Sequence, residues 1–222
     1  MIFQKNNDLI HFIHIPRTGG RWVSSLLQKS NYEPVIFGQE FWGGIQTHHL
    51  SYLEAKEYYL KKNWTEKSFA VVRDPITRFE SAFQLFLDFT LIENYNVLED
   101  YDYFCWVMND KPMITWVEGN HNKNYRYQIN GLINAHNGMW RPQFDYISFD
   151  TKIWKYENGL NEIFSDWLKE EVNLDIIENT SHQVQYKNTY FDNKKYKLSD
   201  KIKDNIFNYY KPDYKRFYTN LL

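Results

Sequence analysis

The stretch Asp8–Pro16, DLIHFIHIP, is the feature that most limits what this chain can fold into. If the stretch is extended, apolar side chains fall on both of its faces, Leu9, Ile13 and Ile15 on one and Ile10 and Phe12 on the other. A strand that is apolar on both faces is typical of a parallel sheet covered by helices. A Gly-Gly turn follows, and RWVSSLLQKS then places its apolar residues on one helical stripe. We therefore predict a strand, a tight turn and a helix.

The same unit occurs again further along the chain. SFAVV (Ser68–Val72) is a short apolar strand, and RDPITRFESAFQLFLDF after it has a helical stripe of phenylalanines. Thr77 and Glu80 fit a capping box at the start of that helix. Between the two units, THHLSYLEAKEYYLKKN is typical of a loop that leads into a helix.

The last third of the chain continues the alternation. We predict strands over Phe144–Phe149 and Lys152–Glu157, a helix in NGLNEIFSDWLKEE capped by Asn158, and a last helix capped by Ser199 and stopped by Pro212. Strands that alternate with helices predict an α/β fold, here a three-layer sandwich around a central, mainly parallel sheet. We expect one domain, 1–222, in which 88–140 is the least regular part and EGNHNKNYRYQING is loop-like.

Composition limits the partners. The formal net charge is −2, which argues against a nucleic-acid-binding surface, so any anion site must be local. The single cysteine, Cys105, allows no internal disulfide and no zinc site built on cysteines, and we expect it to be a core residue. We see neither a signal-peptide pattern nor the roughly 20 apolar residues of a membrane span, so we expect a cytoplasmic protein.

The turn HIPRTGG has the chemistry of an anion cradle. Gly19 and Gly20 let the backbone come close to a ligand, and the helix after them presents N–H groups and a positive dipole end. Thr18 adds a hydroxyl donor, and Arg17 adds a fixed charge with a planar fork of donors. The alternative is a plain turn with a surface arginine. G-x-x-x-x-G-K-[ST] is absent, which argues against an ordinary ATPase or GTPase.

VVRDPITRFES carries the second anion signal. Arg73 ends the second predicted strand, and Ser81 lies eight residues later in the following helix. Ligands of open parallel sheets bind beyond the carboxyl ends of the strands, so both side chains could contact one phosphate there. The alternative is that Arg73 pairs with Asp74 or Glu80 and that Ser81 has no special role.

These segments together resemble the sulfotransferases that use 3′-phosphoadenosine 5′-phosphosulfate, especially the carbohydrate and heparan-sulfate type (sulfotransferase family 2). HIPRTGG is similar to their P-K-T-G-G loop, and VRDPITRFESAF is similar to their R-[DN]-P segment with its later serine. WRPQFDYI is similar to the W-x-P-Q segment of the Golgi-type enzymes, KYENGLNEIFSDWL to their next strand–helix unit and YYKPDYKRFY to their C-terminal tail. The likeness runs from about Ile10 to Tyr218 and is poorest in the middle.

The resemblance implies a P-loop NTPase-like sulfotransferase fold with 3′-phosphoadenosine 5′-phosphosulfate as donor, the 3′,5′-bisphosphate as product and no metal. Arg73 and Ser81 would hold the 3′-phosphate, and the 5′-phosphosulfate would be held by Arg17, Thr18, Gly19, Gly20, Arg21 and Trp22. The family usually has lysine at the position of Arg17, where it neutralises the bridging oxygen as the sulfuryl group leaves. Arginine supplies charge and donors there but has a different geometry and no removable proton.

Sulfuryl transfer to an alcohol also needs a group that removes the hydroxyl proton, and histidine suits this near neutral pH. His49 stands before Leu50 and five residues before Glu54, as the base does in many relatives that the chain resembles. His48 is the second candidate, and the alternative for the pair is helix capping. We expect His11 and His14, in the first strand, to be packed or hydrogen-bonded.

NAHNGMWRPQ offers the flat aromatic face and the amide donors that sugar sites use. Its candidate acceptor-binding residues are His136, Trp140, Arg141 and Gln143, although a structural role for Trp140 is equally consistent. The sequence thus predicts a sulfotransferase that acts on a glycan or small-molecule hydroxyl, with 88–140 as an acceptor-side insertion. A small-molecule kinase and a non-catalytic nucleotide- or glycan-binding protein stay open, as does the oligomeric state.

Overall fold

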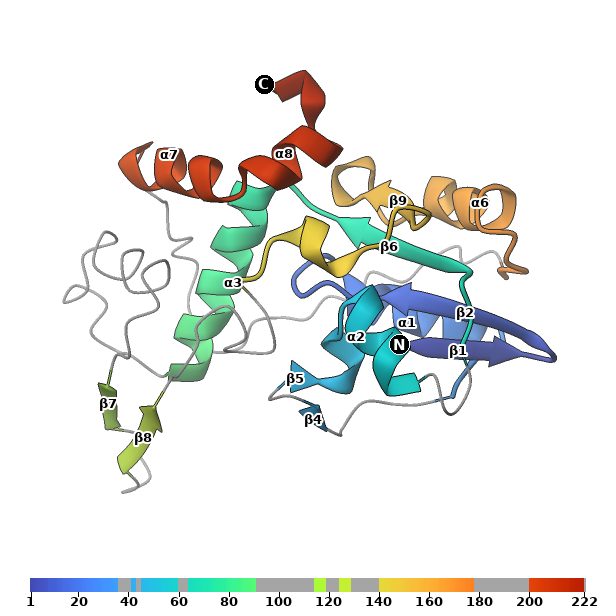
Figure 1. Cartoon of the computed structure of the whole chain (residues 1–222), viewed down its shortest axis with the longest axis horizontal. Coiled ribbons are helices and arrows are strands. Elements are labelled where there is room, and N and C mark those ends of the chain that lie inside the picture. Colours follow the sequence, from blue (N-terminus) through green and yellow to red (C-terminus); the bar gives the residue numbers. More distant parts are fainter. Residues whose placement is uncertain are drawn as a thin grey trace.

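The computed structural model describes residues 1–35, 41–42, 45–59, 64–90, 114–118, 124–128, 140–177 and 200–221. Five strands form the main sheet in the order β3-β1-β2-β6-β9 (Figure 1). Their bounds are β1 (Ile2–Lys5), β2 (Asp8–Ile13), β3 (Glu33–Pro34), β6 (Ser68–Val72) and β9 (Lys152–Lys155). The strands predicted at the two anion segments and at Lys152 are therefore confirmed.

Helices cover both faces of this sheet. Their bounds are α1 (Gly20–Lys29), α2 (Tyr52–Tyr59), α3 (Pro75–Thr90), α6 (Glu162–Glu170), α7 (Asp200–Tyr209) and α8 (Lys211–Phe217). Figure 1 shows α1 behind β1 and β2, and α2 in front of them. One apolar core joins the sheet to α1 and α6, and a second core joins the opposite face to α2 and α8. The predicted α/β class with helices on both sides is thus confirmed.

The sheet is mixed, whereas we predicted a mainly parallel one. β2–β6 and β6–β9 pair in parallel, but β1 pairs with β2 and with β3 in antiparallel fashion. The cause is the two-residue turn between Lys5 and Asp8, because so short a connection can join only antiparallel strands. Asn6 takes a left-handed conformation there, with φ 55°, which asparagine tolerates. The parallel strands β2, β6 and β9 still lie side by side, so their carboxyl ends share one edge.

Two helices begin at residues other than those predicted. Asp74 caps α3, since its Oδ1 accepts from the Thr77 N–H at 2.9 Å, so Thr77 and Glu80 do not form the predicted capping box. In an Asp-Pro pair the aspartate caps the helix, and the proline is a first helical residue whose φ is already suitable. Asn161 caps α6 through the Ile163 N–H at 3.1 Å, and the predicted cap Asn158 lies outside the helix.

The predicted strand over Phe144–Phe149 is also wrong. Gln143–Tyr146 forms a 3₁₀ helix, whose N–H groups of Gln143 and Phe144 donate to the Asp213 carboxylate at 2.9 and 2.8 Å. This buried carboxylate therefore holds the segment against α8. The helix predicted to be the last one is α7, which ends at Tyr209. Pro212 lies in the first turn of a further helix, α8, so it follows α7 and begins another helix.

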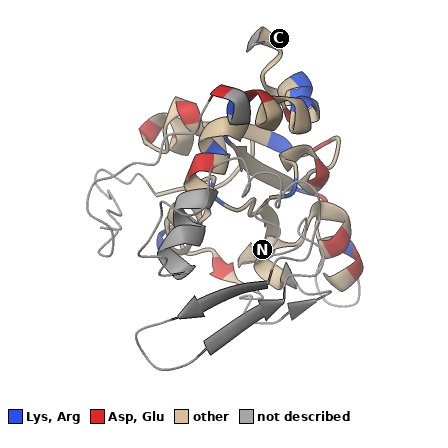
Figure 2. Ribbon diagram, turned by 90° about the vertical axis from the view of Figure 1, so that its left-hand side faces the viewer, with Lys and Arg blue, Asp and Glu red and all other residues tan. Residues whose placement is uncertain are grey.

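The stretch predicted as a loop before residue 131 contains a strand. β7 (Ile114–Glu118) pairs with β8 (Asn124–Gln128), and a second short pair joins β4 (Phe41–Trp42) to β5 (Ile45–Gln46). Cys105 and Ser199 lie outside the described residues. In the described part of the chain, no helix is both long and apolar enough to cross a membrane. Figure 2 shows acidic and basic residues interspersed over the described helices.

His11 is a buried histidine within the sheet. It lies on β2 beside the rings of Tyr52 and Trp64, with centroid distances of 6.0 and 5.2 Å. Neither of its ring nitrogens has a hydrogen-bond partner among the described residues. Burial, assisted by the nearby N-terminal ammonium group, holds the pKa of His11 well below 6.5. The folded protein therefore keeps this ring neutral.

We expect His11→Phe to weaken the pH dependence of the free energy of unfolding. Below about pH 6.5 the unfolded chain protonates His11 and the folded protein does not. The unfolded state then binds more protons, so stability falls as the pH drops, by about 1.4 kcal/mol per pH unit for each such histidine. Urea unfolding at pH 5, 6, 7 and 8 measures the slope. Phe12→Leu is the control and should lower stability equally at each pH. An unchanged slope in His11→Phe would contradict the expectation.

Candidate active site

The two predicted anion segments meet at one edge of the sheet, because β2 and β6 are adjacent parallel strands. Arg17 donates from Nε and Nη2 to the Ser81 Oγ at 3.0 and 2.8 Å. Arg73 donates from Nη1 to the carbonyl oxygen of Arg17 at 3.4 Å. The structure thus brings together Arg17, Arg73 and Ser81, which the sequence placed in two separate phosphate sites.

The backbone of Arg17 is strained. Its φ of 70° lies in the left-handed region, which costs about 1–3 kcal/mol for a residue with a long side chain. Such strain persists only where the surroundings fix the residue, and it is concentrated at active sites and ligand clamps. Here Arg73 holds the carbonyl group and Ser81 holds the guanidinium group. The turn therefore keeps one unusual shape.

The rest of the turn forms the start of α1. Thr18 is buried, and its hydroxyl donates to the Ile15 carbonyl at 2.9 Å. This hydroxyl therefore stabilises the turn, whereas we predicted that it would donate to a ligand. Gly19, with φ 88°, caps α1 without a side-chain acceptor, and the first turn has no acidic residue. The helix start is therefore suited to an anion. Arg21 is exposed, and Trp22 packs against Phe164 with ring centroids 5.8 Å apart.

Arg73 is an oriented charge at this edge. Its Nε donates to Thr77 Oγ1 at 3.2 Å, and its guanidinium group lies 4.8 Å from the centroid of the Tyr156 ring. Within the described ranges it forms no ion pair, so the alternative of pairing with Asp74 or Glu80 is not seen. A guanidinium group that is fixed in direction and lacks a carboxylate partner is what an anion site requires.

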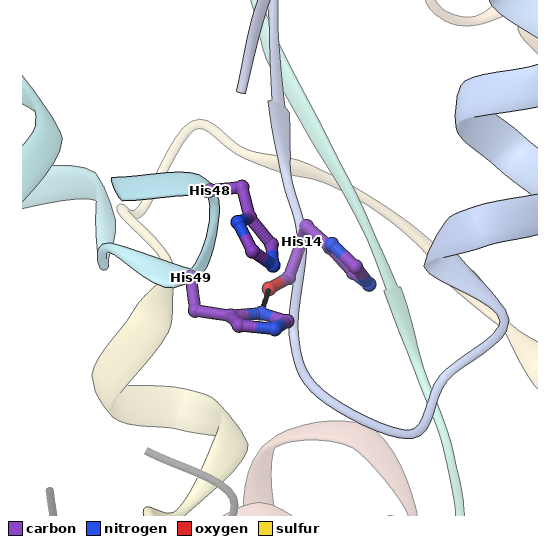
Figure 3. A group of neighbouring side chains, drawn as sticks. All are labelled: His14, His48 and His49. Atoms are coloured by element: carbon purple, nitrogen blue, oxygen red, sulfur yellow. Dashed lines mark hydrogen bonds between the residues drawn. The ribbon is translucent and has the colours of Figure 1, made fainter. Parts of the chain in front are cut away.

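Three histidines cluster beside the turn (Figure 3). His14 follows β2, and His48 and His49 belong to the 3₁₀ helix Thr47–His49, which precedes α2. The ring centroids of His14 and His49 are 4.5 Å apart, and those of His48 and His49 are 4.0 Å apart. The Nδ1 of His49 lies 3.1 Å from the carbonyl oxygen of His14. A carbonyl only accepts, so Nδ1 carries the hydrogen, and Nε2 of the neutral ring is a proton acceptor.

Burial keeps His14 and His49 neutral. Burial is the main cause that lowers the pKa of His49 to about 3, and the neighbouring His48 adds to the effect. The hydrogen bond to the His14 carbonyl opposes these two causes. Burial, followed by the two other histidines, also holds the pKa of His14 well below 6.5. At neutral pH both rings are therefore uncharged.

The same cluster could hold a metal ion. Each of His14, His48 and His49 offers one ring nitrogen, and these nitrogens lie within 4.8 Å of one another. Neutral imidazole is a common ligand of Zn²⁺. Because metal ligands must be deprotonated, an ion bound there would compete with protons for the same nitrogens.

Gly20 determines how His14 packs. A Cβ atom at Gly20 would lie 1.8 and 1.9 Å from Cδ2 and Nε2 of His14. The ring can therefore pack on the start of α1 only because residue 20 has no side chain. This contact joins the Gly-Gly turn directly to the histidine cluster.

The predicted acceptor-binding residues are buried in internal contacts. Arg141 pairs with Glu54 through two hydrogen bonds of 2.8 and 2.9 Å, and Trp140 is only 2% exposed. The Gln143 side chain accepts from the Arg73 N–H at 2.9 Å and donates to the Arg73 carbonyl at 2.7 Å. These three side chains thus have scaffolding contacts instead of the acceptor contacts that the sequence suggested. His136 lies outside the described residues.

Other residues of the site escaped the sequence reasoning. Arg78 is fully buried and donates to the carbonyl oxygens of Pro16 and Arg141, each at 3.0 Å. Glu54 forms a capping box with Ser51 at the start of α2, through bonds of 2.8 and 3.3 Å, besides its pair with Arg141. Burial acts to raise the pKa of Glu54, but Arg141 and Ser51 outweigh it and lower the pKa. The S-x-x-E spacing could have revealed this box. Neither Arg78 nor Tyr156 has a comparable local signal.

The edge of the sheet therefore combines two arginines and a helix start suited to an anion with a neutral imidazole beside them. No family model, curated protein or solved structure matches the chain. The chemistry of the site is accordingly inferred from this arrangement.

We expect Gly20→Ala to lower the free energy of unfolding by about 1–3 kcal/mol, the usual cost of overpacking. In an open helix position the same change would stabilise the protein by about 1 kcal/mol, so the sign is informative. Urea unfolding measures both variants. Ser25→Ala, at a half-buried position of the same helix, is the control and should stay within about 0.5 kcal/mol of the wild type. If Gly20→Ala is as stable as the wild type, the His14 ring does not require a residue without a side chain at position 20.

Proposed function

We propose that this protein is a sulfotransferase of P-loop-like fold that transfers a sulfuryl group from 3′-phosphoadenosine 5′-phosphosulfate to an acceptor hydroxyl, in the first instance that of a carbohydrate. The observation that carries the proposal is the contact of Arg17 with Ser81, which joins the two anion segments at one edge. A ligand held there would interact with both segments. A nucleotide with phosphate groups at its 3′ and 5′ positions has anionic groups for each.

In the proposed reaction the acceptor oxygen attacks sulfur in line with the bond to the 5′-phosphate. A new oxygen–sulfur bond forms, the bond from sulfur to the phosphate oxygen breaks, and 3′,5′-bisphosphate leaves. The hydroxyl proton moves to Nε2 of His49, whose Nδ1–H stays bonded to the His14 carbonyl. The N–H groups and dipole at the start of α1 stabilise the charge on the leaving phosphate. His49 is thus the proposed proton acceptor, and the start of α1 is the proposed site for the leaving phosphate.

The low pKa of His49 suits a base that acts only in the loaded site. With a pKa of about 3, the free protein holds a weak proton acceptor. The negative donor raises this pKa, since a nearby anion favours the protonated imidazole. Binding of the donor would thus activate the base.

A non-catalytic nucleotide- or glycan-binding protein is the second candidate. Arg17 favours it, because the family that the chain resembles usually has lysine there and because this side chain is engaged with Ser81. A binder would keep the anion site without using His49. A kinase is disfavoured because the sequence has no Walker A motif.

We expect adenosine 3′,5′-bisphosphate to bind at least about tenfold more tightly than ATP, since a charge-assisted hydrogen bond is worth about 1.5–3 kcal/mol. Isothermal titration calorimetry measures both affinities, with Arg73→Gln as the weakened variant. Lys29→Gln, exposed at the far end of α1, is the control. Mass spectrometry of a panel of glycan and phenol acceptors, incubated with the sulfate donor, then tests transfer.

Equal affinity for the two nucleotides would overturn the proposal at its base. A clear preference for the bisphosphate without sulfation of any acceptor would instead support the non-catalytic binder.

We expect His49→Ala to lower kcat by about 10²–10⁴-fold, the usual contribution of a general base. The affinity for the bisphosphate should stay within a few-fold of the wild-type value, because the variant keeps both arginines. His48→Ala is the matched control from the same 3₁₀ helix and should retain most of the activity. Unchanged turnover in His49→Ala, with loss in His48→Ala, would move the base to His48.

A further inference from the structure

We infer that Arg17 makes the site selective for a nucleotide with a second phosphate, by binding that phosphate together with Arg73 and Ser81. The inference rests on the proposed function. It departs from the family resemblance, which assigns the residue at this position to the leaving phosphate.

The direction of the Arg17 side chain is the first support. Its Nε and Nη2 both donate to one oxygen, the Oγ of Ser81, at 3.0 and 2.8 Å. These two N–H groups form the edge of the guanidinium group that binds phosphate oxygens in pairs. A phosphate oxygen beside Ser81 would meet the same edge. The residue therefore directs its donors at the second junction, on α3.

The backbone of the turn holds this direction. Arg17 keeps its left-handed φ of 70° while Arg73 bonds its carbonyl oxygen at 3.4 Å. The next residue, Thr18, is tied to the Ile15 carbonyl at 2.9 Å. Gly19 and Gly20 remain at the start of α1, where they suit the other phosphate group. The turn thus divides its donors between two anionic groups.

Charge gives the third support. Arg73 forms no ion pair among the described residues, and its guanidinium group is oriented by Thr77 and by the Tyr156 ring. Arg17 adds a second guanidinium group at the same corner, which suits a phosphate that carries two charges. Lysine could place a charge there but not a flat pair of N–H donors. Arginine at this position is therefore explained by the second phosphate.

The test compares two probes, adenosine 3′,5′-bisphosphate and adenosine 5′-phosphate, by calorimetry at constant salt. We expect the wild type to prefer the bisphosphate at least tenfold. Arg17→Lys should reduce this preference to less than threefold and leave the affinity for the 5′-phosphate within twofold. Lys29→Gln, at the exposed end of α1, is the control and should keep the wild-type preference. Thermal unfolding confirms that each variant is folded.

Ser81→Ala tests the proposed site of the second phosphate from its side on α3. It is the deciding variant if Arg17→Lys does not fold. It should also reduce the preference, and the double variant should lose less than the product of the two single losses. If either variant keeps the wild-type preference, the inference is wrong. If Arg17→Lys keeps the preference while sulfuryl transfer slows, Arg17 acts on the leaving phosphate. If the wild type itself shows no preference, the proposed function fails, which is a different result from failure of the inference alone.

Discussion

The parallel pairing of β2 with β6 is the constraint on which the rest of the structure depends. Ile13, the last residue of β2, lies opposite Ala70 in this register, and β6 ends two residues further on, at Val72. Each strand then runs into a turn and a helix, and the Arg73 side chain bonds the carbonyl oxygen of Arg17 across the two turns. A slip of one residue would exchange the two faces of a strand and separate these turns. The apolar cores on both sides of the sheet therefore maintain the site as well as the fold.

A layer of buried polar side chains stabilises the loops around that edge. Arg78 joins the Pro16 carbonyl to that of Arg141, and Asp213 holds the 3₁₀ helix that follows. Buried polar groups are costly when they lack partners, so each of these contacts favours one arrangement of the loops. The same fact explains why the WRPQ segment resembles a sugar site but is internal. Trp140 packs on the Phe79 ring, Arg141 pairs with Glu54, and Gln143 bonds the backbone of Arg73.

The sequence predicts those parts of the fold that have a local pattern. β2 and β6, together with α1 and α3, follow from runs or stripes of apolar residues, and the glycine turn after Ile15 follows from its composition. The β1–β2 hairpin was missed because a four-residue strand has too few residues to show alternation. The candidate site was predicted as two anion segments with a histidine nearby. Its closure by Arg17 and Ser81, and the burial of Trp140 and Gln143, depend on contacts across more than 60 residues of chain.

Gln143 has a consequence for how β6 ends. Its side-chain amide meets both the N–H and the C=O of Arg73, just as one residue of a neighbouring strand would. The amide thus replaces the pair of backbone hydrogen bonds that a neighbouring strand would make at the residue after β6. Glutamate has the same shape but two acceptors, so it would leave the Arg73 carbonyl facing another oxygen. Position 143 therefore needs an amide for a structural reason, whether or not a ligand contacts it. Because both backbone groups of Arg73 are bonded to Gln143, only its side chain could contact a ligand.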